Sequence, residues 1–379
     1  MRKVTRLREL KKHDMMVKQG SESMQEQNSS ASFLEHYHQE RKKIEQEIKG
    51  WNQQLGTSHR DKLEPFFRFF QNLNQGGKYL RAYLIGLGAK FEQYLPLAVA
   101  YEVFQTSILI HDDIIDHADL RRGTKTIPQQ YQEYLPQNEI VEVPDVAASV
   151  ALCLGDYGFF LVEEWILKHY VNHPAFSNIL HYYHETVLKT CEGELLDVVL
   201  PLEERIQKGQ VTEEDIFTIY RYKTARYTTV GPFCLGMLLA GATEQDLQEV
   251  TKPLEKMGIA FQIKDDLLGI FGKEDEVGKS NSSDISEYKQ TILYSYMLQV
   301  EKSFAKPFFE LYGKSKITVE EQGRIQKLLI ESGAKQYAEQ KMEQLFQESK
   351  IEIELCQCLN QQQKEELFGF ISYLKTRKN

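Results

Sequence analysis

The apolar residues of this chain recur at helical spacing and rarely alternate as they would in strands. Residues 33–51 place Phe33, Tyr37, Ile44 and Ile48 near helical intervals, which predicts a helix with one buried face. Longer segments are apolar almost throughout: PLAVAYEVFQTSILI, DVAASVALCLGDYGFFLVEEWIL and PFCLGMLLAGA. They are too long for half-buried strands and predict central helices that are buried nearly all round. The pattern therefore predicts an all-α protein.

Helical periodicity is missing from the first part of the chain. Residues 1–30 mix Lys, Arg, Gln and Ser with few apolar positions, and GSESMQEQNSSAS has the composition of a solvated segment. No repeat of the solenoid type is visible in the sequence. We therefore expect a flexible tail over residues 1–30 and a single domain over residues 31–379.

Composition narrows the class of protein. Of 379 residues, 41% are hydrophobic, enough for a substantial core, and the net charge of -9 disfavours a nucleic-acid-binding surface. By inspection, no apolar stretch approaches the ~20 residues that span a bilayer, and no apolar segment follows the first basic residues. The five cysteines include no CxxC pair. We expect a soluble, cytoplasmic protein with reduced cysteines, no nucleic-acid partner and no transmembrane segment.

Two acidic clusters each follow an apolar run: HDDIID at 111–116 and IKDDLLG at 263–269. In a helix, Asp112 and Asp116 would stand one turn apart, about 6 Å between their side-chain roots, and could converge on one cation. Oxygen ligands of this kind suit Mg²⁺, which takes one or two carboxylates and completes its shell with water and substrate phosphates. Two such helices facing one another would hold a diphosphate between metal ions.

An acidic cluster has a simpler interpretation, because most such clusters cap or solvate the end of a helix. For one cluster alone, the two interpretations are about equally favoured. The second cluster favours a binding site, since carboxylates seldom follow core-like apolar runs unless something pairs them.

Basic residues near the first cluster fit an anion. Arg121 and Arg122 follow it directly and can chelate phosphate oxygens. In NQGGKYLRAYLIG, Gly77 frees the backbone for close approach while Lys78 and Arg81 share a helical face. This stretch is a candidate second anion site, although a GG pair before a helix is more often only a turn.

The ordered set of motifs resembles a known family, the trans-isoprenyl diphosphate synthases or polyprenyl synthetases, and within it the geranylgeranyl diphosphate synthases. The resemblance covers roughly residues 33–379 and rests on GGKYLR, HDDIIDHADLRRG, LGDYGF, GELLD, YKTARYT, GIAFQIKDDLLGIFG and GKSNSSDISEYKQT. It implies an isoprenoid synthase-type bundle of antiparallel helices around a deep central cavity, and a homodimer. It also implies a prenyltransferase that joins isopentenyl diphosphate to dimethylallyl, geranyl or farnesyl diphosphate.

The resemblance also assigns roles to residues. Asp112 and Asp116 would bind two of three Mg²⁺ ions and Asp265 the third, with Asp113 and Asp266 in support and Mn²⁺ able to substitute. Catalysis would depend on these ligands and on Lys223. The allylic diphosphate would contact Arg121, Lys223 and Lys279. Isopentenyl diphosphate would be held by Gly77, Lys78, Arg81, Gln105 and Arg122, with Thr224, Gln262 and Lys289 as further pocket residues.

The chemistry supports these roles. Loss of diphosphate leaves an allylic carbocation, so the site must neutralise charge on the leaving group and keep water from the cation. The departing diphosphate is the expected base for the final proton, since no His or Glu is clearly placed for that step.

One position departs from the family pattern: Gly269 stands where a third aspartate is usual. This removes one acidic side chain from the second cluster. We do not infer a loss of activity, because the first aspartate of the motif is the one that meets metal in the family.

Product length depends on the helix that ends in the first cluster. Ser107 and Ile108 lie about one turn before Asp112, and in the family a bulky aromatic there blocks the growing tail. Ser107 is small, so the next large obstacle is Phe104, roughly 12 Å from Asp112 at 1.5 Å rise per residue. This predicts geranylgeranyl diphosphate or a longer product.

Two rival functions remain open from the sequence. An isoprenoid cyclase would need no second diphosphate pocket, so the basic set at Lys78, Arg81, Gln105 and Arg122 argues against it. A non-catalytic subunit that regulates a partner synthase would be expected to lose one acidic cluster or the GGK stretch, whereas here only position 269 departs.

Overall fold

The computed structural model describes residues 32–55, 63–121, 123–134, 143–207, 211–272 and 283–377. The expected tail over residues 1–30 lies outside the described residues. The described part is almost entirely helical, which confirms the all-α prediction, and its strands form one short antiparallel hairpin, β1 Leu120–Arg121 with β2 Thr124–Lys125.

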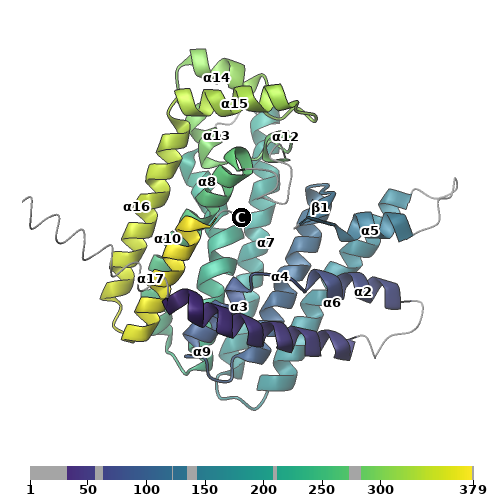
Figure 1. The fold of residues 1–379 in the computed structure, drawn as a ribbon, viewed down its shortest axis with the longest axis vertical. Coiled ribbons are helices and arrows are strands. Elements are labelled where there is room, and N and C mark those ends of the chain that lie inside the picture. Colours follow the sequence, from purple (N-terminus) through teal and green to yellow (C-terminus); the bar gives the residue numbers. More distant parts are fainter. Residues whose placement is uncertain are drawn as a thin grey trace, which may run out of the picture.

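The helices follow one another with short connections. The first covers residues 32–55, and the others are α2 Glu64–Leu73, α3 Leu80–Gly88, α4 Leu95–Ile115, α5 Ile127–Tyr134, α6 Val143–Tyr170, α7 Phe176–Gln207, α8 Glu213–Ile219, the π-helix η1 Tyr220–Val230, α9 Gly231–Leu239, α10 Glu244–Phe271, α12 Ser283–Ser286, α13 Ile292–Met297, α14 Lys302–Phe309, α15 Val319–Glu331, α16 Ala334–Leu355 and α17 Gln361–Thr376. In Figure 1, α16 runs along α10, and α13, α14 and α15 cover one end of the bundle.

Helix α4 lies at the centre of the bundle. Every residue from Leu97 to Ser107 is buried, as its uniform apolar pattern predicts. Packing on all sides fixes the axis of this helix, which packs closely against α6 and α3. The last turn of α4 therefore carries Asp112 on a rigid support.

Helices α6 and α7 are not buried all round, which corrects the expectation for the apolar segment within residues 145–167. Phe160 on α6 is 70% exposed, and Leu188 and Leu195 on α7 are 63% and 64% exposed. A uniform apolar pattern does not distinguish a helix inside the core from one whose second face needs another partner. The two helices thus present an apolar surface.

Helix α6 is also the one helix in the described part of the chain that is long and apolar enough to cross a membrane, by length and composition alone. Its most apolar window has a mean hydropathy of 1.5, and 33% of that window is buried. The expectation that the chain has no apolar stretch of this length was wrong, because few charged residues interrupt the apolar positions of α6. The helix packs against α4 and α5, so its composition does not establish a membrane span.

The π-helix η1 lies directly against α7. A Cβ atom on Gly193 of α7 would lie 2.3 Å from the backbone nitrogen of Lys223 in η1, a separation that no side chain tolerates. Glycine at this position therefore allows the two backbones to touch. The contact places Lys223 beside the next turn of α7, and π-helical turns often occur at functional sites.

The helix over residues 32–55 joins the C-terminal helix α17. His36 Nδ1 contacts Glu366 Oε1 at 2.8 Å, and the hydroxyl of Tyr83 donates to the other carboxylate oxygen at 2.5 Å. The rings of Phe33 and Phe370 meet edge to face. These contacts fix the position of α17, whose end reaches the site described below.

Candidate functional site

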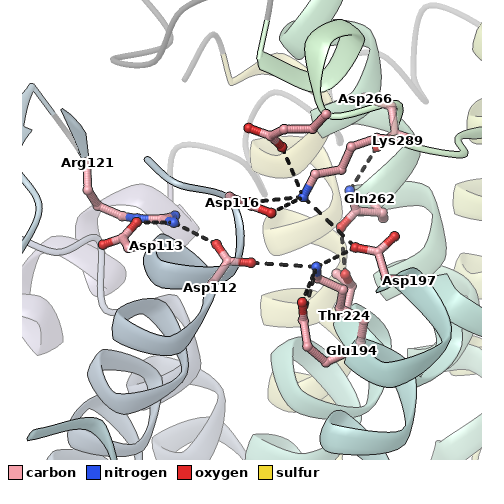
Figure 2. Close-up of polar contacts among 12 residues, drawn as sticks. Asp112, Asp113, Asp116, Arg121, Glu194, Asp197, Thr224, Gln262, Asp266 and Lys289 are labelled. Atoms are coloured by element: carbon pink, nitrogen blue, oxygen red, sulfur yellow. Dashed lines mark hydrogen bonds and ion pairs between the residues drawn. The ribbon is translucent and has the colours of Figure 1, made fainter. Parts of the chain in front are cut away.

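The two acidic clusters line the same cavity. Asp112 and Asp116 come from the end of α4, and Asp265 and Asp266 come from the last turns of α10. The cavity has a volume of about 340 Å³ and is also lined by the cationic residues Arg121, Lys223 and Lys289. Figure 2 shows several of these side chains converging from opposite walls. The clusters thus face a shared space, as the sequence predicts.

The hairpin turns Arg121 back onto the first cluster. Its Nη2 donates to Asp112 Oδ2 at 2.6 Å, and its Nε donates to Asp113 Oδ1 at 2.6 Å. Burial by itself lowers the pKa of the guanidinium, but the two carboxylates outweigh it and hold the pKa above its usual value. Asp113 is fully buried against this arginine and therefore supports the site from behind.

Two lysines form ion pairs with the acidic side chains beside the cavity. Lys223 Nζ lies 2.6 Å from Asp197 Oδ2, 3.0 Å from Glu194 Oε2 and 3.5 Å from Asp112 Oδ1. Lys289 Nζ lies 3.0 Å from Asp116 Oδ2 and 3.9 Å from Asp197 Oδ2. Both ammonium groups therefore lie among the acids beside the cavity, as Figure 2 shows for Lys289 and Asp116.

Glu194 and Asp197 were missed by the sequence reasoning, which used GELLD only as a family motif. Burial raises the pKa of Glu194 despite the neighbouring Lys223. Burial also acts to raise the pKa of Asp197, but Lys223 and Lys289 outweigh it and the pKa is lowered. Two acids three positions apart in an apolar helix were the available signal.

Asp266 has a different environment from its neighbour Asp265. Its carboxylate accepts hydrogen bonds from the hydroxyl of Tyr220 and from Gln262 Nε2, the latter at 2.8 Å. Burial raises the pKa of Asp266 to about 7 although both hydrogen bonds act to lower it. Thr224 donates to Gln262 Oε1 at 2.6 Å, so this group of residues forms one hydrogen-bonded wall.

Asp265 forms an ion pair with Arg377, which follows the end of α17. The guanidinium is buried and lies 4.0 Å over the ring of Phe261. Burial, together with the nearby Arg81, lowers the pKa of Arg377 to about 10. This residue was also missed, because an arginine in the terminal KTRKN sequence is indistinguishable from a solvated charge.

The second basic set forms its own cluster beside α4. Arg81 donates to Thr228 Oγ1 at 2.8 Å and stacks 4.0 Å over the ring of Tyr227. Gln105, with its amide oriented to suit both neighbours, accepts from Arg81 Nη1 at 2.8 Å and donates to Glu102 at 2.9 Å. Gln105 therefore positions Arg81.

The GGK stretch lies next to this cluster and is anchored by the first helix. The Tyr37 hydroxyl donates to the Lys78 carbonyl at 2.5 Å, and Gly77 is buried. Neither Lys78 nor Arg81 lines the cavity between the acidic clusters. The structure thus joins Arg81 to Gln105 outside that cavity, and Gly77 and Lys78 stand just before α3, the helix that carries Arg81.

The remaining predicted residues divide into two groups. Arg122 and Lys279 lie outside the described residues. Phe104 and Ser107 are fully buried, with the ring of Phe104 5.4 Å from that of Tyr183 in α7. Ile108 is half-buried against the core. None of these three chain-length candidates lines the cavity, so their role stays a prediction.

The acidic residues fit a hard divalent cation that is shared with a substrate. Among the described residues, no group of three or more His, Cys, Asp or Glu could hold a metal by itself. The carboxylates of Asp112, Asp116 and Asp265 nevertheless border one cavity beside the cationic side chains of Arg121, Lys223 and Lys289. Mg²⁺ commonly takes only one or two carboxylates and draws its other ligands from water and substrate phosphates. The donor set is therefore suited to Mg²⁺.

Comparisons with known proteins find relatives among the isoprenyl diphosphate synthases. The chain is 28% identical over 254 residues to a short chain isoprenyl diphosphate synthase of Methanocaldococcus jannaschii, covering 65% of this chain and 70% of that protein. It is 28% identical over 291 residues to a geranylgeranyl diphosphate synthase of Methanosarcina mazei, covering 75% and 81%.

Solved structures share the fold. A geranylgeranyl pyrophosphate synthase from Corynebacterium glutamicum, complexed with isoprenyl diphosphate and magnesium, superposes with a TM-score of 0.79 at 23% identity, over 89% of this chain and 98% of that one. The polyprenyl synthetase family model matches residues 67–330. Because this match spans well over half of the chain, the protein belongs to the polyprenyl synthetase family and is a transferase of the trans-prenyl class.

Proposed function

We propose that the protein condenses isopentenyl diphosphate with an allylic diphosphate and releases diphosphate and an elongated polyprenyl diphosphate. One observation carries the proposal: Asp112 and Asp116 on one wall and Asp265 on the other border a single cavity with Arg121, Lys223 and Lys289. Carboxylates for metal and cations for phosphate are the two components that ionisation of an allylic diphosphate requires.

The residues of the cavity have distinct tasks in this proposal. Mg²⁺, for which we propose three ions and Mn²⁺ as a substitute, would be held by Asp112, Asp116 and Asp265 and would neutralise charge on the leaving diphosphate. Lys223 and Lys289 would donate hydrogen bonds to the same diphosphate, as would Arg121. Arg121 is buried and the other groups are partly buried, which would strengthen each charge interaction and help to keep water from the carbocation.

A second diphosphate would bind beside Arg81 and Lys78. Arg81 is already held in place by Gln105, Thr228 and Tyr227, so an acceptor diphosphate would meet a preorganised cation. Among the described residues, no histidine lines the acidic cavity, and the carboxylate of Glu194 beside it is paired with Lys223, which supports the departing diphosphate as the base for the final proton.

This second basic set favours a synthase over an isoprenoid cyclase, which handles one diphosphate. A non-catalytic regulatory subunit is disfavoured by the presence of both acidic clusters in the same cavity. The two rivals differ from the proposal in what the purified chain alone would do with both substrates.

We also propose that the protein is a homodimer whose subunits meet through α6 and α7. Exposed apolar residues follow one face of each helix: Leu152, Phe160 and Leu167 on α6, with Val171 just after it, and Leu188, Leu195, Val199 and Leu202 on α7. Exposed apolar residues in this number are typical of a contact surface, and a two-fold axis lets the same surface cover itself. Self-association would account for the patch without a membrane, which supports a cytoplasmic location.

Substitution of Asp112 by Ala should lower kcat by several orders of magnitude, because an ionising diphosphate without its metal leaves the transition state uncompensated. Steady-state release of diphosphate measures the effect, and circular dichroism should show a folded protein. Asp145→Ala, at an exposed position in the first turn of α6, is the matched control and should keep wild-type turnover. Near-normal turnover of Asp112→Ala would contradict the assignment.

Lys78→Ala and Arg81→Ala should mainly raise the KM for isopentenyl diphosphate, since these side chains lie apart from the cavity that holds the breaking bond. The KM for the allylic substrate should change less. Initial rates with each substrate varied in turn separate the two constants. An equal rise in both would show that the chain does not have two separate diphosphate sites.

Geranylgeranyl diphosphate or a longer chain should be the product from farnesyl and isopentenyl diphosphates. Ser107→Phe should shorten the product and Phe104→Ala should lengthen it, because both positions lie along the central helix below Asp112. Chromatography of the dephosphorylated alcohols gives the chain length, and melting temperatures show whether each buried substitution is tolerated. Farnesyl as the final wild-type product would contradict the proposed length.

Phe160→Asp combined with Leu188→Asp should convert a dimer into a monomer, because it buries charge at the centre of the proposed contact. Light scattering after size exclusion measures the mass of each form. Val319→Asp, at a position 87% exposed on α15, should leave the dimer intact. A monomeric wild type, or one that sediments with lipid vesicles through these residues, would refute the dimer.

A further inference from the structure

The second acidic motif has no side chain one turn after Asp265, where Gly269 stands. The space beside this glycine is nevertheless filled. A Cβ atom on Gly269 would lie 2.3 Å from Asp284 Oδ2 and 3.3 Å from Asp284 Cγ. The first separation is too short for any side chain at 269 while Asp284 keeps its place. A carboxylate from another element thus occupies the place beside position 269.

The backbone around Asp284 fixes this arrangement. Asp284 belongs to α12, a single turn, and its carbonyl accepts a hydrogen bond from Lys289 N at 3.0 Å. The next residue, Ile285, is fully buried, and its carbonyl accepts from Gly313 N at 2.8 Å. These contacts hold α12 in place, and α12 also packs against α10, so the fold directs the side chain of Asp284 at Gly269.

Asp284 also shares the cavity with the predicted metal ligands. It lines the same space as Asp116 and Asp265. Its charge also affects the neighbouring groups. Burial is the main cause of the raised pKa of Asp266, and the negative charge of Asp284 raises that pKa further. Burial acts to lower the pKa of Lys289, but the neighbouring acids, Asp284 among them, outweigh it and hold this pKa above its usual value.

We propose that Asp284 supplies the third carboxylate of the second acidic cluster, in place of the side chain that Gly269 lacks. The cation and diphosphate on this wall would then face Asp265, Asp266 and Asp284, contributed by two elements. A cation can be coordinated by oxygen atoms at suitable positions, whichever segment of the chain provides them. Glycine at 269 makes the room that Asp284 needs. This inference rests on the proposed function.

The test uses variants that remove the carboxylate of Asp284 and then supply a carboxylate from position 269 instead. Titration calorimetry with Mg²⁺ and inorganic diphosphate gives the metal affinity without turnover. Asp284→Ala and the nearly isosteric Asp284→Asn should each weaken Mg²⁺ binding about 10- to 100-fold, the usual loss when a supporting group of a metal site is removed. Asp145→Ala, at an exposed position in the first turn of α6, should bind Mg²⁺ like the wild type.

The double variant Gly269→Asp with Asp284→Ala is the decisive one. It places an aspartate at 269 in the space that Asp284 has left, and it should recover most of the lost Mg²⁺ affinity. Gly269→Asp alone should bind Mg²⁺ no more tightly than the wild type, because the place is already occupied. A purely structural role of Asp284 would leave the double variant as weak as Asp284→Ala, which would overturn the proposal.

Two further outcomes separate this inference from the proposed function. If the wild type binds Mg²⁺ with diphosphate, and Asp112→Ala abolishes that binding while Asp284→Ala does not weaken it, only the role of Asp284 is wrong. If the wild type shows no Mg²⁺ binding in the presence of diphosphate, the proposed function and the role of Asp284 are both overturned.

Discussion

The site depends on the mutual neutralisation of buried charges. Asp197 stands between Lys223 and Lys289, 2.6 Å from one ammonium group and 3.9 Å from the other. Two cations at this depth would repel one another and lose their hydration without an acid between them. Asp112 pairs with Arg121, and Asp265 pairs with Arg377. The charged side chains of the site are therefore paired with one another.

This network explains how the site would accept a highly charged ligand pair. Metal ions would take the carboxylates, and a diphosphate would take the lysines and arginines, so each buried charge exchanges one partner for another of the same sign. The charged side chains lose their hydration when the protein folds, so ligand binding does not require this desolvation again. The fold serves this exchange: glycine at 193 sets η1 against α7, and the hairpin returns Arg121 to the end of α4.

Sequence patterns predicted the parts of the structure that depend on neighbours along the chain. The spacing of apolar residues predicted the helices. The apolar runs that precede Asp112 and Asp265 predicted that these acids stand near the ends of buried helices. Arg377 and Asp284 could not be found in this way, because each acts on α10 from a distant segment and reads in sequence as a solvated charge. The exposed faces of α6 and α7 were missed for a related reason, since apolar composition does not say what covers a helix.

The most direct test of the central claim is the product formed by the purified chain alone from isopentenyl diphosphate and farnesyl diphosphate, with Mg²⁺ or with a chelator. Extraction and chromatography, with diphosphate measured in parallel, give the result. The account predicts an elongated prenyl diphosphate and one equivalent of diphosphate for each condensation, only when both substrates and Mg²⁺ are present. Release of diphosphate with a hydrocarbon product from the allylic substrate alone, or no product without a second protein, would contradict it.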